Sequence, residues 1–263
     1  MKKLPDSLNE LLQTYEKLRD PVTGCPWDRV QNFKSIADCT IEEAYEVVDA
    51  IEREDFSDLK SELGDLLFQI IFHAGMAEEK KKFNLQDVVE EINSKLVRRH
   101  PHIFGDANAE TAEESLMLWE KIKTKERGEK KLTSLLDDVP KNLPSLARAR
   151  KLQKRASTVG FDWKDDKKVL LKLEEEIEEL KHEVKKQDKA NMKDEIGDIF
   201  FTLVNLCRHL GFNAEDIVKQ SNNKFELRFK KMEQIVLRKN DKLEDLTLDE
   251  LEELWEIAKN ETN

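Results

Sequence analysis

Carboxylate side chains recur in this sequence at a spacing that suits a metal site. Glu43 and Glu46 stand three residues apart, and so do Glu62 and Asp65. Residues three apart share one face of a helix, so each pair presents two carboxylates in the same direction. The turn between the two predicted helices is short, so we expect them to pack antiparallel and bring the pairs together. Four carboxylates should then converge.

The same pattern returns 133 residues later without a gap. Over positions 42 to 74, nine residues are identical to those of the second copy: Glu42/Glu175, Glu43/Glu176, Glu46/Glu179, Asp55/Asp188, Lys60/Lys193, Glu62/Glu195, Gly64/Gly197, Asp65/Asp198 and Phe68/Phe201. An ungapped match of this kind indicates an internal duplication. The second copy therefore supplies another quartet, and Glu42 and Glu175 are candidates for a fifth ligand in each.

Two interpretations of these acids remain open, a solvated acidic face and a metal site. A single ExxE pair in a chain with 38% charged residues is usually a solvated acidic face. Both second pairs, however, head apolar runs that we expect to be buried, Leu63 to Phe72 and Ile199 to Leu206. Buried carboxylates repel one another unless a cation neutralises them. Oxygen ligands without cysteine select Mg²⁺, Mn²⁺ or Ca²⁺. Gly64 and Gly197 weaken their helices and suggest the close approach of a helix or an ion.

Divalent cations held by carboxylates are suited to hydrolysis of a polyphosphate. The eight glycines form no GxxxxGK motif, so basic side chains must help to hold the phosphates. The candidates lie just after each quartet or within it: Lys95 with Arg99, Lys224 with Arg228, and Lys60 with Lys193.

A ferritin-like di-iron bundle is a rival interpretation of the acids. It requires two ExxH motifs. Only Glu179 with His182 fits, because Asp49 occupies the position that corresponds to His182. The sequence therefore favours a magnesium-type site.

Length and composition indicate two all-α domains. The chain has 263 residues but only eight glycines and six prolines, which favours helices with few tight turns. We expect an N-terminal helical domain at 1–127, a linker at 128–144 and a C-terminal helical domain at 145–263. Helices are expected at 7–19, 40–53, 58–80, 84–99, 111–127, 145–158, 166–187, 191–210, 214–237 and 247–259.

Charge and cysteine usage bear on partners and compartment. The net charge of -11 argues against a sequence-independent grip on nucleic acid, which needs a basic face. No run of 18 apolar residues occurs and the N-terminus lacks an apolar signal region, so no membrane association is expected. Three scattered cysteines fit a reducing cytoplasm.

The ordered motifs resemble one known family. EEAYE with ELGD, EEIEE with EIGD, GCPWD, RRHPHIFGD, GFDW and NNKFELRF are similar to those of the MazG nucleoside triphosphate pyrophosphohydrolases, of the all-α NTP pyrophosphatase superfamily. The resemblance covers nearly the whole chain. It implies hydrolysis of a ribo- or deoxyribonucleoside triphosphate to the monophosphate and diphosphate, broad base tolerance, dependence on Mg²⁺ with Mn²⁺ as a substitute, and a homodimer of helical bundles.

The resemblance also implies roles for individual residues. By position, the quartet Glu176, Glu179, Glu195 and Asp198 would bind Mg²⁺, with Glu175 assisting or orienting the water. Lys224 and Arg228 would hold phosphates with help from Lys172 and Lys193, and Trp255 would pack near the nucleotide. A metal-bound water would attack the α-phosphorus while a carboxylate takes its proton.

The two halves differ outside the quartets. A basic helix and the GFDW motif precede only the second quartet, so we expect the C-terminal half to be the main hydrolytic site. The N-terminal half, with Glu43, Glu46, Glu62 and Asp65, is expected to bind metal. The alternative from another class is a non-catalytic nucleotide-sensing or scaffold dimer that keeps its metal sites.

Overall fold

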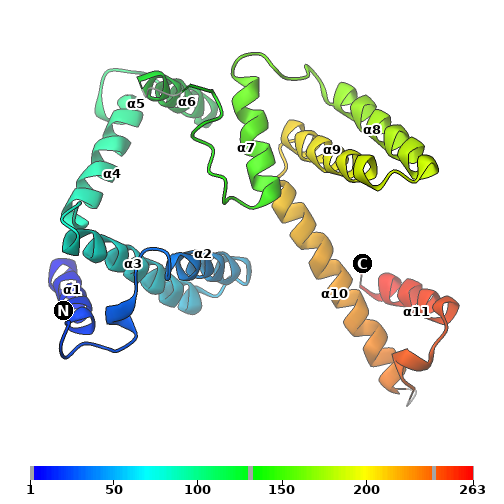
Figure 1. The fold of residues 1–263 in the computed structure, drawn as a ribbon, viewed down its shortest axis with the longest axis horizontal. Helices are drawn as coiled ribbons and strands as arrows, with labels where there is room; N and C mark the ends of the chain where they lie inside the picture. Colours follow the sequence, from blue (N-terminus) through cyan, green and yellow to red (C-terminus); the bar gives the residue numbers. More distant parts are fainter. Residues whose placement is uncertain (1–2, 130–132, 239–240, 263) are drawn as a thin grey trace. The chain divides into compact units, whose positions relative to one another are not determined.

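The protein is helical throughout the part of the chain that the structure describes. The computed structural model describes residues 3–129, 133–238 and 241–262, and no strand occurs in these ranges (Figure 1). The chain divides into two compact units, Met1–Glu129 and Lys130–Asn263. The prediction of an all-α protein with two tandem helical parts is confirmed.

Unit 1 is built around a helical hairpin. Its elements are α1 (Leu4–Arg19), the short 3-10 turn η1 (Asp28–Val30), α2 (Ala37–Glu52), α3 (Phe56–Glu79), α4 (Leu85–Arg99), α5 (Pro101–Phe104) and α6 (Ala112–Glu129). Helices α2 and α3 form the hairpin, and α1 packs against α3 through Tyr15 and Phe72, whose rings meet edge to face 5.4 Å apart.

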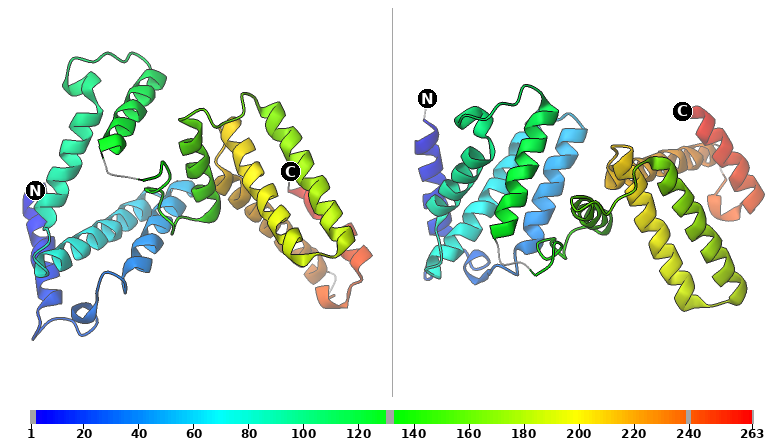
Figure 2. Two further views of the ribbon diagram at one scale, coloured as in Figure 1. Left: turned by 45° about the horizontal axis from the view of Figure 1, so that its top comes forward. Right: turned by 90° about the horizontal axis from the view of Figure 1, so that it is seen from above.

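Unit 2 repeats the hairpin. Its elements are α7 (Ser145–Ser157), α8 (Asp166–Lys186), α9 (Lys189–His209), α10 (Ala214–Arg238), η2 (Leu243–Asp245) and α11 (Leu248–Glu261). Helices α8 and α9 form the second hairpin, α7 packs against α9, and α11 packs against α10. Figure 2 shows both hairpins from two further directions.

The duplicated aspartates explain why both hairpins turn in the same way. Asp55 and Asp188 are the N-caps of α3 and α9, and each side chain accepts hydrogen bonds from two backbone N–H groups of the first helical turn. The residue before each cap, Glu54 or Gln187, has a positive φ of 53° or 57°. An Asp cap satisfies amides that the helix itself leaves without a partner. An aspartate thus caps the second helix of both hairpins in the same way.

Several boundaries differ from the sequence prediction, and α1 begins at Leu4 instead of residue 7. Helix α2 begins at Ala37, three residues before the expected start, and α6 continues through Gly128. The segment 133–144 belongs to unit 2 instead of acting as a free tether, because Arg155 of α7 pairs with Asp138 at 2.6 Å and Val139 is buried. A charged stretch that contains prolines usually indicates a linker. Here the buried Arg155 binds the stretch to α7 through Asp138. We propose that the second domain includes this segment.

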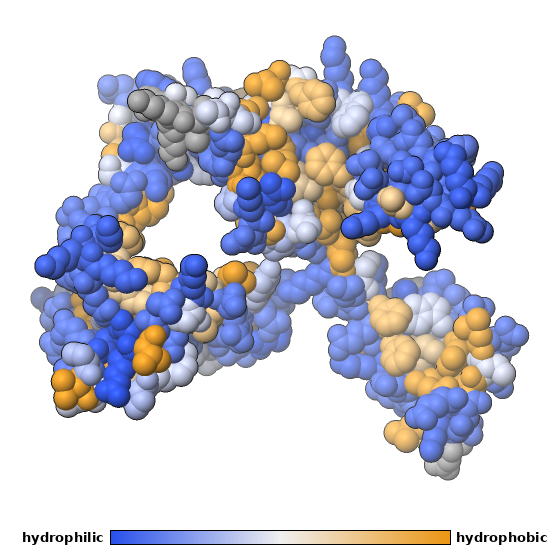
Figure 3. Space-filling model, in the orientation of Figure 1, coloured by the Kyte–Doolittle hydropathy of each residue, from blue (hydrophilic) through white to orange (hydrophobic). Residues whose placement is uncertain are grey.

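The hairpins leave apolar side chains at the surface of the chain. On α3, Ile71 and Phe72 are buried, whereas Leu63 and Ile70 are 50% and 43% exposed. On α9, Phe200 is 57% exposed. Figure 3 shows hydrophobic residues reaching the surface of both units. The expectation that the apolar runs are fully buried is therefore wrong for this chain alone. A two-helix hairpin covers only one side of each helix, so a helix that is apolar all round keeps an uncovered side.

The glycines of the two acid pairs have open space beside them. A Cβ atom built on Gly64 or Gly197 meets nothing within 4 Å, so among the described residues no helix makes the close approach that we expected. The opposite holds at Gly75, where a Cβ would lie 2.2 Å from the ring of Tyr15. The packing of the Tyr15 ring against α3 therefore requires a glycine at position 75.

Replacing Gly75 should destabilise unit 1. Gly75→Ala forces the Tyr15 ring out of its place, and overpacking of this kind lowers the free energy of unfolding by roughly 1–3 kcal/mol. Gly128→Ala is the matched control, because a Cβ there meets nothing within 4 Å. Urea denaturation of the two variants measures the difference. Equal stability of the two variants would show that Tyr15 does not fill the space beside Gly75.

Candidate metal and nucleotide site

The acids of unit 2 converge between α8 and α9. Glu176 and Glu179 lie one turn apart on α8 and face Glu195 on α9, and one oxygen of each lies within 4.8 Å of the others. Glu176 is only 5% exposed. Asp198 is near enough to Glu195 to act on its ionisation. Three members of the predicted quartet thus converge, and Asp198 lies one turn after Glu195 on α9.

Unit 1 gathers the corresponding acids. Glu43 of α2 meets Glu62 and Asp65 of α3, again with one oxygen of each within 4.8 Å of the others. Glu46 is near enough to Glu43 and Glu62 to raise the pKa of both. Both hairpins therefore present a compact set of carboxylates, although their individual roles as metal ligands stay a prediction.

Crowding of the acids raises several of their pKa values. Burial and the charges of Glu179, Glu176 and Asp198 raise the pKa of Glu195. In unit 1, burial and neighbouring acids raise the pKa values of Glu43 and Glu62. The sites are thus under electrostatic strain that a divalent cation would relieve. Donor sets made only of carboxylate oxygens fit a hard cation such as Mg²⁺ or Mn²⁺.

One lysine distinguishes the two sites. Lys172, one turn before the acids on α8, places its Nζ 2.7 Å from Oε1 of Glu175 and 2.9 Å from Oε1 of Glu176. The hydrogen bonds to these carboxylates raise the pKa of Lys172, so it stays charged. The corresponding residue in unit 1 is Cys39. A charged lysine thus borders the acids of unit 2, at the position that Cys39 occupies in unit 1.

In unit 1 the basic residues predicted to bind phosphate have acidic partners. Arg99 bonds to Glu126 of α6 at 2.6 Å, and Arg98 bonds to the same carboxylate. Hydrogen bonds from Arg99 and Arg98 lower the pKa of Glu126 to about 2. Lys95 lies 3.5 Å from Glu91. The charge of Arg99 is thus already neutralised within the protein.

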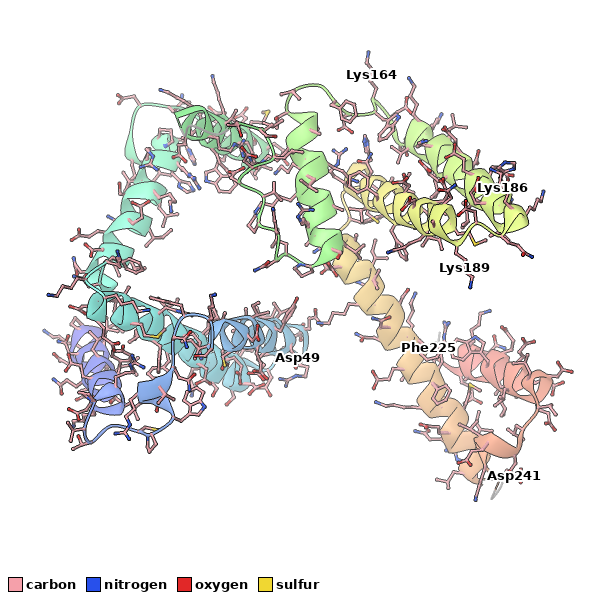
Figure 4. The ribbon with its side chains drawn as sticks, viewed as in Figure 1. Asp49, Lys164, Lys186, Lys189, Phe225 and Asp241 are labelled. Atoms are coloured by element: carbon pink, nitrogen blue, oxygen red, sulfur yellow. The ribbon has the colours of Figure 1, made fainter. Side chains whose placement is uncertain are left out.

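The predicted nucleotide-binding residues of unit 2 fall into two groups. Lys172 and Glu175 lie at the quartet, and Lys193 is exposed on the first turns of α9. The second group lies on α10 and α11: Lys224, Arg228 and Trp255. There the Trp255 ring lies 5.3 Å from Phe225 and 5.8 Å from the Arg228 guanidinium. Figure 4 shows Phe225 well away from Lys186 and Lys189, which mark the turn of the α8–α9 hairpin. The second group thus lies away from the turn of the hairpin.

Sequence reasoning missed a polar cluster beside the GFDW motif. Asp162 accepts hydrogen bonds from Arg208 and contacts Nε2 of His209 at 3.0 Å. Burial alone would raise the pKa of Asp162, but the bonds from Arg208 and His209 outweigh it, and the pKa is lowered. Asn205, one turn earlier on α9, is 3% exposed. Polar residues at 205 and 208, at the end of the apolar run of α9 and just after it, were the available signal.

The domain structure matches a known family in both units. The model of the MazG nucleotide pyrophosphohydrolase domain matches residues 31–104 and again 164–232, and each match contains one hairpin with its acids. The chain belongs to the MazG family. The two matches also confirm the duplication inferred from the repeated acids.

Two relatives of similar length are similar to this chain over nearly its whole length. The nucleoside triphosphate pyrophosphohydrolase of Escherichia coli K12 is 48% identical over 97% of this chain and 97% of its own length. The nucleoside triphosphate pyrophosphohydrolase/pyrophosphatase MazG of Thermotoga maritima is 42% identical over 98% of both chains. An uncharacterized Bacillus subtilis protein, YabN, is 41% identical over 92% of this chain but only 50% of its own length. Among the described helices of this MazG protein, none is long and apolar enough to cross a membrane.

Removing the lysine should strengthen binding of the metal ion alone. Lys172→Met deletes an ammonium that competes for the oxygens of Glu176, and a contact of this kind accounts for roughly a two- to fivefold change in affinity. Titration with Mn²⁺ followed by electron paramagnetic resonance, in a Glu62→Gln background that disables unit 1, measures the affinity of unit 2. Weaker Mn²⁺ binding by the lysine variant would contradict competition.

Neutralising Glu195 should stabilise the metal-free protein and reduce its stabilisation by Mg²⁺. The folded state raises the pKa of Glu195 above its unfolded value, so this group makes the protein less stable as pH rises through the interval between those values. The gain in stability from Glu195→Gln should therefore be larger at pH 7.5 than at pH 5. Thermal melts at both pH values, with and without Mg²⁺, test this. A variant less stable than the wild type at pH 7.5 without metal would contradict it.

Proposed function

We propose that this protein is a Mg²⁺-dependent nucleoside triphosphate pyrophosphohydrolase, which converts NTP and water to NMP and diphosphate. The observation that carries the proposal is the cluster of Glu176, Glu179 and Glu195 with Lys172 at its edge. The names of the E. coli and T. maritima relatives support it. Mn²⁺ is the expected substitute for Mg²⁺, and both ribo- and deoxyribonucleotides are the expected substrates.

The residues of unit 2 have different proposed roles in the reaction. Glu176, Glu179, Glu195 and Asp198 hold the divalent cation, which activates water and neutralises charge on the departing diphosphate. Glu175 is exposed beside the cluster and orients the water that attacks the α-phosphorus. Lys172 contacts Glu175 and Glu176 and lies where it can turn to a phosphate oxygen. Lys193, Lys224 and Arg228 supply further positive charge.

Unit 2 is proposed as the main hydrolytic unit. It has Lys172 beside its acids, where unit 1 has Cys39. Unit 1 keeps the acids that bind metal but lacks the fixed cation beside them. We propose that it binds Mg²⁺ and hydrolyses nucleotide slowly or not at all.

A homodimer would complete the assembly. Exposed apolar residues on both hairpins, such as Ile70 and Phe200, offer a face that a second chain would cover. The three cysteines form no disulfide, which suits a reducing cytoplasm.

The reaction and the unit responsible can be tested together. Phosphorus NMR of ATP and dTTP with the purified protein and Mg²⁺ should show monophosphate and diphosphate. Glu195→Gln should lower turnover by roughly 100-fold or more, because it removes a negative ligand from the metal-binding set. The matched change in unit 1, Glu62→Gln, should leave most of the turnover.

Other results would assign a different activity. Orthophosphate together with nucleoside diphosphate would overturn attack at the α-phosphorus. Nucleotide binding with an unchanged spectrum would favour the nucleotide-sensing or scaffold protein. Equal losses in the two variants would contradict the assignment of hydrolysis to unit 2.

A further inference from the structure

The end of α4 and helix α6 bring cations together around one tryptophan of unit 1. Helix α6 lies beside α4 (Figure 2). The guanidinium of Arg99 on α4 lies 5.7 Å from the centre of the Trp119 ring, and Nζ of Lys123 lies 4.4 Å from it. The face of a tryptophan ring attracts cations. Positive charge is thus concentrated here, in a chain whose net charge is -11.

The same cluster occurs in unit 2. The residues that recur with identical spacing on α6 and α11 are Leu118/Leu254, Trp119/Trp255, Glu120/Glu256 and Lys123/Lys259. On both helices the glutamate pairs with the lysine three residues later, at 4.0 Å in unit 1 and 3.2 Å in unit 2. Arg228, which corresponds to Arg99 in the repeated motif, lies 5.8 Å from the ring of Trp255. The duplication therefore extends to α6 and α11, which lie outside both matches to the MazG domain.

The two clusters differ in one carboxylate. Glu126 follows Trp119 by seven residues, and the residue at the same distance after Trp255 is Thr262. Helix α6 continues past Glu126, whereas α11 ends just before Thr262. The position that carries a negative charge in unit 1 thus carries a neutral hydroxyl in unit 2.

Glu126 contacts the arginines of α4 through both of its oxygens. Nε of Arg98 donates to Oε1 of Glu126 at 2.7 Å, and the guanidinium of Arg99 donates to Oε2 at 2.6 and 3.1 Å. Arginine recognises carboxylate and phosphate groups by the same paired, charge-assisted hydrogen bonds. Only 17% of the Glu126 side chain and 18% of the Arg99 side chain are exposed, so salt screens the contact weakly. The geometry is that of an anion site with an occupant.

From these observations we propose that Arg98, Arg99 and Trp119 form a second site for a polyphosphate chain, and that Glu126 blocks it by taking the place of a phosphate group. The inference rests on the proposed function in one respect, because Arg228, the counterpart of Arg99, is proposed to hold phosphates. It adds the residue that makes the two units differ at this position. A ligand must displace Glu126 to bind, so it must carry more negative charge than one carboxylate.

Protonation does not unblock the site near neutral pH. The hydrogen bonds from Arg99 and Arg98 lower the pKa of Glu126 to about 2, so its carboxylate stays charged. Only a competing anion or a movement of α6 exposes the two arginines. A triphosphate, whose several charged oxygens can engage both guanidinium groups at once, is such an anion.

Removing the carboxylate of Glu126 should unblock the site. The probe is inorganic tripolyphosphate, titrated in EDTA by isothermal titration calorimetry into the full chain with Arg228→Met, which weakens the corresponding cluster of unit 2. Without divalent cations the acids of both hairpins repel the probe. Glu126→Gln in this background should bind the probe roughly 10- to 150-fold more tightly, because a hydrogen bond between charged groups no longer has to be displaced. Glu126→Thr, which matches the residue type of unit 2, should show the same gain.

Two further variants control for charge and for location. Glu120→Gln removes the same charge from α6 but leaves Glu126 on the arginines, so it should give little of the gain. Arg99→Met combined with Glu126→Gln should abolish the gain. The proposal is overturned if Glu120→Gln gives an equal gain, if the gain survives Arg99→Met, or if neither Glu126 variant gains affinity. If Glu126→Gln does not fold, Glu126→Thr decides the question.

These titrations separate the blocked site from the proposed function. They need neither metal nor turnover, so a protein that hydrolyses no nucleotide can still show the gain, and an active enzyme can still lack it. ATP as a second titrant under the same conditions identifies the source of the phosphates. A gain for both probes shows that the site accepts a nucleotide, and a gain for tripolyphosphate alone shows that it accepts only a free polyphosphate. Both results support a site blocked by Glu126.

Discussion

Repulsion among carboxylates is the constraint on which both units depend. Each hairpin packs one helix with two acids three residues apart against another with the same spacing, and the packing that buries apolar side chains also brings like charges together. Such a cluster raises the pKa of its members and favours a bound cation. Hydrophobic packing of the hairpin thus places the carboxylates where a divalent cation would neutralise their charge. The N-cap aspartates Asp55 and Asp188 set the turn that makes this alignment possible.

The duplication provides a comparison within one molecule. Both copies keep the acids and the capped turn, but their surroundings have diverged. Unit 1 pairs Arg99 with Glu126 and fills the space beside α3 with Tyr15. Unit 2 places Lys172 against its acids and keeps a polar cavity beside α9. These differences are those expected if one copy specialised in catalysis and the other in stability and metal binding.

Apolar surface and divided site residues point to the same conclusion about assembly. Each hairpin buries one side and exposes another, and Gly64 and Gly197 lie with open space beside them. The basic and aromatic residues of α10 and α11 form a cluster of their own around Trp255. A second chain packed on the hairpins would cover the apolar faces and add charge near the acids. This is the physical basis for the proposed homodimer.

The sequence by itself determined the helices, the duplication and the identity of the acids, because helical periodicity and ungapped repetition are local properties. It also determined the family, through motifs such as EIGD and GFDW. Only tertiary structure decided which side chains neutralise one another: Glu126 with Arg99, Asp138 with Arg155, and Lys172 with Glu176. It also decided that Gln153 keeps a buried oxygen without a partner, and that the apolar runs stay partly exposed. These properties depend on contacts between distant segments, which spacing along the chain does not specify.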